Sequence, residues 1–589
     1  RKACERNMIK KLGTYLKGYG RESVLGPLFK LLEALFELFV PLVVAKMIDQ
    51  GIRGGEGEAY VWKMGGLLLL LGVVGLVFSI TAQYFAARAS VGFASRLRET
   101  LYDRVTRLSA SQLDRIGSSR LTQRLTGDVD QVQNGLNLAL RLMLRSPFVV
   151  FGSMIMAFTV DGKSAWIFAV MIPALSIVVF GVMAWSLKLF KRSQANMDRV
   201  MNLVRENLTG MRVIRAFGRD GSENARFTDA SDKLNASQRT AGRVSALTNP
   251  LTSVIVNLAL IVLIHTGALR VDTGTLSQGQ LVALVNYMSQ ILVELIKLAN
   301  LIVSISKALA CFDRVQTVID LPEDATERAA GAALDRAADV AVRFDHVELV
   351  YPGAGAPSLE DVSFVAHRGE TIGIVGPTGS GKSSLVNLIP RFYDATRGSV
   401  ELYGQDVKRL SPEDIRRSVG MVPQKTVLFS GSIADNVRWG KTDASDADVL
   451  NAIDGAQGTD ILSKKNEGMN APVGQGGRAL SGGQRQRVAI ARALVRNADI
   501  LILDDSASAL DFATDARLRA AIRARQGGQT VFIVSQRASG VRYADRILVM
   551  DEGRVSAQGT HEELMQSSAL YREIYFSQFP EGDHVCESR

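Results

Sequence analysis

Cysteine and histidine are scarce in this sequence, and their scarcity excludes several kinds of site. The 589 residues include 3 cysteines and 5 histidines. Cys4, Cys311 and Cys586 lie far apart, without the spacing of a zinc site or of a disulfide framework. We therefore expect neither a metal motif of that kind nor a disulfide-stapled fold. The few cysteines fit a reducing, cytosolic environment.

Acidic residues are outnumbered by basic ones, and no cleavable signal peptide is apparent. The net charge is +10 at pH 7. The lysines and arginines flank apolar runs, as in the basic cytoplasmic loops of membrane proteins, so we expect no nucleic-acid partner. The sequence begins at Arg1, and we expect some N-terminal residues to be missing. An amphipathic basic stretch, MIKKLGTYLKGY, precedes the first apolar run.

Charged residues are nearly absent from several long runs in the first half of the chain. Hydrophobic residues make up 47% of the sequence and charged residues 22%, so the two kinds must be segregated. A helix needs about 20 apolar residues to cross a bilayer. We expect six membrane spans, at about 24–50, from Val61 through the run MGGLLLLLGVVGLVFSITAQYFAA, and at about 133–160, 163–188, 244–270 and 276–300.

The linkers between these spans alternate in length and charge. Those after the first, third and fifth spans are short, whereas those after the second and fourth are long, helical in pattern and rich in arginine. The positive-inside rule places the long linkers and both termini in the cytoplasm. Spans two to five then continue as cytoplasmic helices. Short helices at the linker tips, near Ser111–Gly117 and Phe217–Ala225, are expected to touch a soluble domain.

The first expected span carries charged residues. Glu33 and Glu37 are four residues apart and therefore lie on one helical face. Intramembrane carboxylates are costly and usually face a partner or a cavity. Two interpretations stay open: Glu33 pairs with Lys30, or Glu33 and Glu37 line a cavity that attracts cationic substrates. Similar candidates in other spans are Arg141, Arg145, His265, Glu294 and Lys297.

The second half contains a phosphate-binding loop between a strand and a helix. Residues 372–375, IGIV, form a short apolar strand, and the helix SSLVNLI follows the loop. The pattern GxxxxGK[ST] lets backbone N–H groups converge on phosphate oxygens at a helix N-terminus. Its lysine reaches the β- and γ-phosphates, and its serine hydroxyl binds Mg²⁺. The pattern consists of Gly376, Pro377, Thr378, Gly379, Ser380, Gly381, Lys382 and Ser383.

A second apolar strand, ILILD, ends in two adjacent aspartates. Asp504, at the end of that strand, is expected to share a Mg²⁺ ion with Ser383. One nucleotide cannot easily use two phosphate cradles of a single domain, whereas two domains packed head to tail place one cradle on each side of the same γ-phosphate. The second anion site is expected at a turn that enters a basic helix. This turn is Leu480, Ser481, Gly482, Gly483 and Gln484.

Together these motifs resemble those of ATP-binding cassette (ABC) exporters, over essentially the whole chain. The resemblance implies an α-helical six-span membrane domain of the type I exporter fold, with an N-terminal elbow helix, and an α/β P-loop nucleotide-binding domain. Tyr351 matches the aromatic residue that stacks on adenine. The phosphate-binding loop is the family's Walker A motif, which Ser384 completes. Gln424 matches the Q-loop residue, which also approaches Mg²⁺. The D-loop matches Ser508, Ala509, Leu510 and Asp511. The implied segments are the membrane domain at 1–320, a linker at 321–340, the nucleotide-binding domain at 341–578 and a tail at 579–589.

Two positions depart from the family pattern. Asp505 stands where the family has a catalytic glutamate, and Gln536 stands where it has a switch histidine. Together these changes resemble the degenerate subunit of heterodimeric bacterial multidrug-type exporters. The resemblance implies that this chain's Walker site binds ATP and Mg²⁺ with slow or no turnover. The turn Leu480–Gln484 matches the family's signature and is intact, which implies that it serves the ATP site of a partner half-transporter that has the glutamate and the histidine.

Our expectations for the substrate and for the membrane rest only on the class of protein that the sequence resembles. Apolar spans with few charges suit a small amphipathic or lipophilic substrate, such as a drug, a lipid or a peptide. We expect export across the bacterial plasma membrane, in contact with its lipid. Two alternatives stay open: a homodimeric exporter in which Asp505 is a weak catalytic base, and an ATP-gated channel or regulatory membrane protein.

Overall fold

The computed structural model describes residues 11–321, 334, 336, 338–463, 466–525 and 528–579. The chain forms two compact units, one of residues 1–106 with 119–321 and the other of residues 107–118 with 322–589. The first unit is helical, and the second contains all the strands that the structure describes. Most of the expected linker at 321–340, and nearly all of the expected tail at 579–589, lie outside the described residues.

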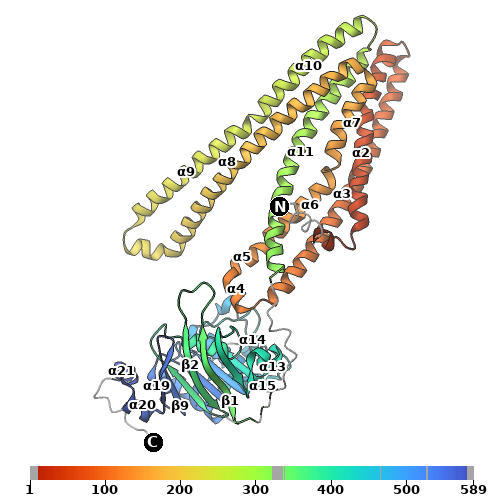
Figure 1. Cartoon of the computed structure of the whole chain (residues 1–589). Coiled ribbons are helices and arrows are strands. Elements are labelled where there is room, and N and C mark those ends of the chain that lie inside the picture. Colours follow the sequence, from red (N-terminus) through yellow and green to blue (C-terminus); the bar gives the residue numbers. More distant parts are fainter. Residues whose placement is uncertain are drawn as a thin grey trace. The chain divides into compact units, whose positions relative to one another are not determined.

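The first unit is built from long helices that follow one another along the chain (Figure 1). At about 1.5 Å per residue, each of the two longest exceeds twice the bilayer core of about 30 Å. These two, α3 with 50 residues and α8 with 55, therefore extend well beyond a membrane, as the arginine-rich linkers predict. The helices are α2 (Gly20–Lys46), α3 (Gly57–Thr106), α5 (Ser118–Gln123), α6 (Val129–Leu142), α7 (Arg145–Val160), α8 (Gly162–Ala216), α9 (Asp220–Ala246), α10 (Thr248–Asp272) and α11 (Gln278–Ile319).

Fewer helical stretches than the six expected are apolar enough to cross a membrane. Helix α2, expected as the first span, has 27 residues, but Lys30, Glu33 and Glu37 interrupt its apolar run. The Lys30 ammonium and the Glu33 carboxylate lie 2.5 Å apart, which lowers the cost of placing both in hydrocarbon. The five stretches among the described residues that are long and apolar enough are Glu58–Thr106, Ser118–Val160, Gly162–Ala216, Asp220–Asp272 and Gln278–Ile319.

Short polar linkers fix the ends of the membrane helices. Asp161 caps the start of α8, and its carboxylate lies 2.9 Å from the guanidinium of Arg270 in the last turn of α10. Ser277 caps the start of α11. Asp49, in a π-helical turn after α2 (Met47–Arg53), accepts a hydrogen bond of 2.8 Å from the Gly279 backbone. These contacts tie α2 to α11 and α8 to α10 at the short linkers.

Among the described residues of this unit, a larger and a smaller apolar cluster help to hold the helices together. In the larger cluster, Tyr287 of α11 is fully buried, and its hydroxyl donates to the Leu38 carbonyl of α2 at 2.6 Å. In the smaller cluster, Val200, Leu203 and Ala230 pack α8 against α9. Helices α8 and α9 run side by side as far as the turn that joins them (Figure 1).

The second unit contains two sheets. A four-stranded antiparallel sheet has the order β2-β1-β4-β5, and a six-stranded sheet has the order β10-β9-β3-β8-β7-β6. In the larger sheet all neighbours are parallel except β9 and β10. Strands β3 and β7 are buried throughout, because both faces of a parallel sheet are covered. The strands are β1 (Val340–Leu349), β2 (Leu359–His367), β3 (Thr371–Val375), β4 (Arg397–Leu402), β5 (Gln405–Asp406), β6 (Val419–Val422), β7 (Ile500–Asp504), β8 (Thr530–Val534), β9 (Arg546–Asp551) and β10 (Arg554–Gly559).

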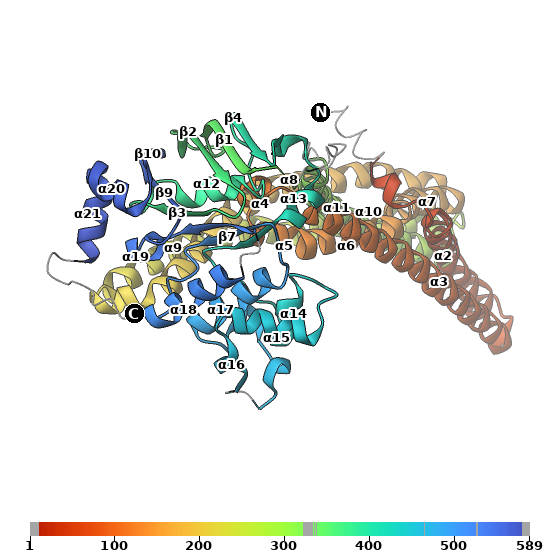
Figure 2. The ribbon, with the colours of Figure 1, turned by 90° about the horizontal axis from the view of Figure 1, so that it is seen from below.

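Helices cover both faces of the six-stranded sheet. Leu385 and Val386 of α12 pack with strands of both sheets, so α12 lies between them. Helices α14 to α18 gather on the other side of the larger sheet (Figure 2). The helices of this unit are α4 (Ala110–Ile116), α12 (Lys382–Leu388), α13 (Pro412–Ser418), α14 (Ile433–Arg438), α15 (Asp446–Gly455), α16 (Thr459–Ser463), α17 (Gly482–Leu494), α18 (Phe512–Ala524), α19 (Ala538–Val541), α20 (His561–Ser567) and α21 (Ala569–Gln578).

Candidate functional site

A cleft of about 620 Å³ opens where strands β3, β7 and β8 end. The carboxyl ends of neighbouring parallel strands are the usual place for a ligand in an open α/β sheet. The volume lies within the range of about 300–1,000 Å³ that is typical of small-molecule sites. Of the residues expected to act on ATP, the lining contains Thr378, Gly379, Gly381, Lys382, Ser383, Ser384, Gln424, Asp504, Asp505 and Gln536.

The phosphate-binding loop between β3 and α12 is tightly folded. A Cβ atom on Gly376 would lie 2.2 Å from a backbone oxygen of β9, so no larger residue fits there. Gly381, the N-cap of α12, has φ +93°, which favours glycine. Lys382 Nζ donates to the carbonyl oxygens of Gly376 and Pro377 at 2.8 and 2.6 Å, and Ser380 is buried inside the loop. Burial lowers the pKa of Lys382, so an anion beside its ammonium group would stabilise the charged form.

Ser383 and Asp504, the two residues predicted to hold Mg²⁺, lie together on one side of the cleft. The Ser383 hydroxyl donates to Asp504 Oδ1 at 3.0 Å. Burial raises the pKa of Asp504, and the neighbouring Asp505 carboxyl raises it further. A divalent cation would offset the cost of charging a carboxylate there. Hydroxyl and carboxylate oxygens are ligands that Mg²⁺ accepts together with phosphate oxygens and water, so these residues fit the ion.

The Asp505 carboxylate lines the cleft beside this pair. Burial raises its pKa, whereas a hydrogen bond with Gln424 and the charges of Lys382 and Arg537 act in the opposite direction. Its φ of +47° is a left-handed conformation, which aspartate adopts more readily than most residues. Its backbone N–H donates to the Val534 carbonyl at 3.1 Å. The side chain therefore projects from a backbone that is anchored to β8.

Gln486 of α17 anchors the same backbone from the other side. This residue is 4% exposed. Its Nε2 donates to the Asp505 carbonyl at 3.2 Å, and its Oε1 accepts from the Ala509 backbone at 3.1 Å. Because Ala509 belongs to the D-loop, one buried amide joins the basic helix, Asp505 and the D-loop.

The loop after β8 carries Gln536 and is held from the end of the domain. Gln536 is exposed and lines the cleft. Its carbonyl accepts a hydrogen bond of 2.9 Å from Nε2 of Gln578 in α21, and Gln578 Oε1 accepts from the Ala538 backbone at 2.8 Å. The Arg537 guanidinium lies 4.9 Å from the centre of the Phe512 ring. The loop is therefore clamped by α21 on one side and by α18 on the other.

The signature turn precedes α17, and the described residues that line the cleft do not include it. Ser481 is the N-cap of α17 and forms a capping box with Gln484, whose side chain accepts from the Ser481 backbone at 2.9 Å. Leu480 is buried, whereas Ser481 and Gly482 are exposed and Gly483 is half-buried. The turn is thus an accessible helix N-terminus of the kind that binds anions. In the D-loop that follows β7, comprising Ser508, Ala509, Leu510 and Asp511, the last residue caps α18.

Known proteins share this arrangement over almost the whole chain. The family profiles described as ABC transporter transmembrane region and ABC transporter match residues 23–295 and 359–508. YfiB of Bacillus subtilis, an uncharacterized ABC transporter ATP-binding protein, is 35% identical over 579 residues, which are 98% of this chain and 100% of that protein. The chain belongs to the ABC transporter family.

Two further comparisons show which kind of ABC transporter this chain resembles. The ATP-dependent lipid A-core flippase of Cupriavidus metallidurans is 32% identical over 98% of this chain and 97% of that protein. The solved structure of a bacterial Atm1-family ABC exporter with ATP bound has a TM-score of 0.81 at 26% identity, covering 95% of this chain and 99% of that one. The predicted fold, an exporter-type helical membrane domain followed by an α/β nucleotide-binding domain, is confirmed. The chain is an ABC exporter half-transporter, and its nucleotide-binding domain binds ATP.

Tyr351 of the transporter, predicted to stack on adenine, lies beside the cleft. Its hydroxyl donates to Ser384 Oγ in the first turn of α12 at 3.1 Å. Among the described residues, Tyr351 lines a neighbouring cavity of about 170 Å³, together with Ser109 and Ser111 at the start of α4. Tyr351 therefore lines that cavity and is joined to the ATP cleft through Ser384.

The tips of the two long linkers of the transporter differ. Residues 107–118, with α4 at their centre, belong to the same compact unit as the nucleotide-binding domain. This agrees with the expected contact of Ser111–Gly117 with a soluble domain. The second tip, expected at Phe217–Ala225, is the turn between α8 and α9 in the first unit, and Phe217 there is 77% exposed.

Glu33 and Glu37 of the transporter both have basic partners. Glu33 pairs with Lys30, as the first of the two interpretations predicts. The Glu37 carboxylate lies 2.6 Å from Arg145 of α7, and Arg145 lies 2.6 Å from Glu294 of α11. These charges join α2, α7 and α11. The Glu37 side chain is 41% exposed, so it is the more accessible of the two carboxylates.

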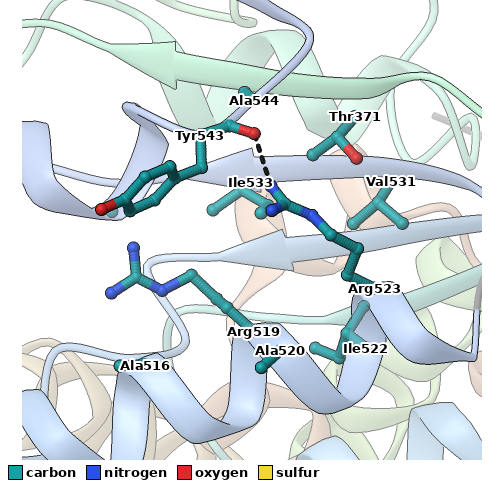
Figure 3. Close-up of a pocket in the computed structure, with 11 residues that line it drawn as sticks. Thr371, Ala516, Arg519, Ala520, Ile522, Arg523, Val531, Ile533, Tyr543 and Ala544 are labelled. Atoms are coloured by element: carbon teal, nitrogen blue, oxygen red, sulfur yellow. Dashed lines mark hydrogen bonds between the residues drawn. The ribbon is translucent and has the colours of Figure 1, made fainter. Parts of the chain in front are cut away.

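A separate cavity of about 230 Å³ lies beside strand β8 (Figure 3). Val531 and Ile533 line it together, because alternate side chains of a strand share a face. The Arg523 guanidinium donates to the Tyr543 carbonyl at 2.5 Å, and Arg519 pairs with a carboxylate of its own helix. Both guanidinium groups at this cavity are thus engaged within the domain, and the cavity is distinct from the ATP cleft.

Sequence reasoning missed several residues that support the ATP site of the transporter. Gln486 was detectable in principle, since it is the polar member among the buried positions of α17. Gln578 gave no local signal, because its bonding partner Gln536 is 42 residues away. Tyr393 lies in the loop after α12, which carries no recognised motif, although its ring packs against the ring of Tyr351.

Proposed function

We propose that this half-transporter works in a heterodimer, in which its own cleft holds ATP and the partner's cleft hydrolyses it. The observation that carries the proposal is that both departures from the family pattern, Asp505 and Gln536, line the same cleft. One of these positions orients water in the family, and the other contacts the γ-phosphate. Because both positions are altered in one site, we expect ATP hydrolysis there to be weakened more than ATP binding.

The length of the Asp505 side chain supports slow turnover. A glutamate would reach about one C–C bond, roughly 1.5 Å, further, and a misplacement of about 1 Å can cost about a hundredfold in rate. The backbone that carries Asp505 is bonded to Val534 and Gln486, so it does not shift easily to restore the reach.

The amide of Gln536 supports the same conclusion. A glutamine side chain can hydrogen-bond to a γ-phosphate but offers no cationic or titrating group. An imidazole at this position would titrate near neutral pH and could stabilise developing negative charge. Since the loop is held by Gln578, the amide stays at the cleft as a contact to ATP and not as a proton carrier.

The groups that bind ATP are complete. Lys382 lies beside the phosphate-binding loop, Ser383 and Asp504 would hold Mg²⁺, and Tyr351 would contact adenine. Mg²⁺, when bound, neutralises phosphate charge. The cleft is therefore suited to keep ATP bound between the two nucleotide-binding domains.

The intact signature turn supports a partner with a complete hydrolytic site. In a head-to-tail pair, the Ser481 turn of this chain closes over the ATP of the partner subunit. That partner is expected to carry the catalytic glutamate and histidine that this chain lacks. A pair also gives the exposed Phe217 at the α8–α9 tip a second nucleotide-binding domain on which to dock.

The proposed setting is the bacterial plasma membrane, with both termini in the cytoplasm. The cargo is a small amphipathic or lipophilic molecule, which agrees with the lipid A-core flippase among the relatives. Glu37, partly exposed beside Arg145, is the proposed cavity group for a cationic part of the cargo, whereas Glu33 is bound to Lys30.

A second candidate is a homodimeric exporter in which Asp505 is a weak catalytic base. The raised pKa of Asp505 favours it, because a general base works best when its pKa approaches the working pH. A third candidate is an ATP-gated channel. Its substrate would flow down its own concentration gradient, and that flux would not depend on ATP hydrolysis.

ATPase measurements on the purified chain, alone and with its co-purified partner, test the proposal. We expect slow hydrolysis by the lone chain and brisk hydrolysis by the pair. Brisk hydrolysis by the lone chain that disappears in Asp505→Asn would establish the homodimer instead. Downhill flux into inside-out vesicles with a non-hydrolysable ATP analogue would establish the channel.

A further inference from the structure

Tyr351 is held in place by two contacts that leave its ring beside the ATP cleft. Its hydroxyl donates to Ser384 Oγ at 3.1 Å, and Ser384 lines the cleft at the start of α12. Its ring meets the Tyr393 ring edge-on, with centroids 4.9 Å apart and planes at 88°. Tyr351 thus has one contact toward the phosphate side of the site and one contact away from it.

Tyr393 carries the second contact on to α4. Its hydroxyl donates to the Asp114 carboxylate at 2.5 Å. Burial and this carboxylate raise the pKa of Tyr393 well above its usual value, so the hydroxyl keeps its proton and remains a donor. Asp114 lies on the seven-residue helix α4, which follows the long helix α3 of the membrane unit in the chain.

The space around these rings permits movement. A cavity of about 170 Å³ is bounded by Tyr351 and Tyr393 on one side and by Ser109 and Ser111 of the α4 N-terminus on the other. Both tyrosines are half-buried. A change in the angle of the Tyr351 ring therefore has room to occur without opening the core of the domain.

We propose that Tyr393 is a positioning residue that transmits the presence of ATP at Tyr351 to the linker helix α4. Stacking on adenine sets the Tyr351 ring at a new angle, while the Ser384 hydroxyl can donate to a phosphate oxygen and still accept from Tyr351. The edge-on contact moves Tyr393, and the bond to Asp114 moves α4. This inference rests on the proposed placement of ATP against Tyr351, and it does not depend on the heterodimer.

A fluorescent label on α4 tests the proposal in the full-length transporter. The exposed Arg115 is changed to cysteine and labelled, in a chain whose three native cysteines are replaced by alanine. The probe is Mg²⁺ with a non-hydrolysable ATP analogue, whose affinity is measured separately by calorimetry. We expect the analogue to change the emission of the label. Tyr393→Phe, which loses one hydrogen bond to a charged group, should reduce that change about tenfold and leave the affinity within about twofold.

Matched variants separate the relay from general damage. Tyr543→Phe removes a hydroxyl from an exposed tyrosine outside this cluster and should leave the emission change intact. Asp114→Asn keeps an acceptor for Tyr393 and should retain most of the change, whereas Asp114→Leu should lose it. Equal behaviour of these two Asp114 variants would overturn the hydrogen-bonded relay.

The placement of ATP is tested independently by Tyr351→Ala. A fall in affinity supports stacking on Tyr351, and unchanged affinity means that the placement itself is wrong. A full emission change in Tyr393→Phe, together with weakened binding in Tyr351→Ala, would contradict the relay alone.

Discussion

The Walker cleft and the signature turn of this chain are both predicted to bind phosphate, and they differ in how completely they keep the family pattern. The cleft keeps Lys382 but has Asp505 and Gln536 at the two positions where the family carries out hydrolysis. The signature turn keeps the capping box of Ser481 and Gln484, with its hydroxyl residue exposed at a helix N-terminus. The alterations are therefore confined to one of the two surfaces.

In the proposed heterodimer, the two surfaces act on different ATP molecules. A chain whose signature closes over the partner's ATP can lose the chemistry of its own cleft and still complete the partner's site. The two surfaces are nevertheless connected inside the chain, since the buried Gln486 bonds to both Asp505 and the D-loop. In the proposed heterodimer, ATP in the cleft of this chain is therefore linked through Gln486 to the signature turn that serves the partner's cleft.

The largest effect is expected from Ser481→Ala in the heterodimer. Removing a donor that stabilises the transition state typically costs about 10²- to 10³-fold in turnover, and we expect that loss although Ser481 lies on the subunit with the weak cleft. Lys382→Ala should cost less than about tenfold, because it affects the cleft that turns over slowly. The measurement is steady-state ATPase at saturating Mg·ATP.

Ser445→Ala is the matched control for this prediction. Ser445 forms the same kind of capping box at α15, with Asp448, so its loss has a similar cost to helix stability of about 1 kcal/mol. It should leave turnover unchanged. A greater loss in Lys382→Ala than in Ser481→Ala would reverse our assignment of the two surfaces.

The next effect is a gain of activity in the cleft of this chain. With the partner's catalytic glutamate changed to glutamine, Asp505→Glu combined with Gln536→His should raise turnover about 10- to 100-fold, because it restores reach and an imidazole. Asp361→Glu is the control, since Asp361 also has a left-handed backbone, with φ +53°, against +47° for Asp505. No gain in the double variant would mean that another feature limits this cleft.

A smaller effect is expected when the clamp on Gln536 is removed. Gln578→Ala loses two hydrogen bonds to the loop after β8, at 2.9 and 2.8 Å. We expect a rise of about two- to fivefold in the Kd for ATP of this cleft, from a loss of about 1 kcal/mol or less, and no change in kcat of the pair. The neighbouring Ser577→Ala, whose hydroxyl bonds within α21, should change neither quantity. A fall in kcat without a change in Kd would contradict the clamp.

The smallest effect is a pH dependence of the stability of helix α21, the helix that carries Gln578. His561 Nδ1 lies 2.8 Å from the Tyr571 hydroxyl, and burial, with help from Arg542, lowers the pKa of His561 below its usual value of about 6.5. The folded state therefore resists protonation more than the unfolded state does. The stability contributed by neutral His561 is present above pH of about 6.5 and is lost as the pH falls below it.

Hydrogen exchange of α21 measures this effect. Protection should decrease between pH 7.5 and pH 5.5 once the intrinsic rate is accounted for, and His561→Phe should remove most of the pH dependence, since phenylalanine does not titrate. An unchanged dependence in His561→Phe would assign it to another group.

Much of the fold was predictable, because its signals are local. The strand, loop and helix around Lys382 follow from a short motif, and the strand ILILD is apolar because β7 is buried on both faces. The long helices follow from apolar runs and arginine-rich linkers. Helix α2 was less predictable as a span, since its charges are compensated by contacts such as that of Glu37 with Arg145, 108 residues away.

The residues that hold the ATP site in place were not predictable, because they too lie far in sequence from the residues they contact. The motifs name Asp505 and Gln536, but the bonds that fix them come from Gln486 and Gln578, which lie 19 and 42 residues away. Such contacts depend on how helices return to the sheet, which no local pattern encodes. The packing of Tyr393 on Tyr351 is a further contact of this kind.

Trapping of a photoreactive ATP analogue with vanadate tests the central claim most directly. Vanadate retains the nucleotide only in a cleft that has hydrolysed it, and irradiation then attaches the label to the subunit whose Walker loop holds that nucleotide. We predict that the label is found on the partner subunit and that Ser481→Ala in this chain abolishes it. Label trapped on this chain, in the cleft that contains Asp505, would contradict the account.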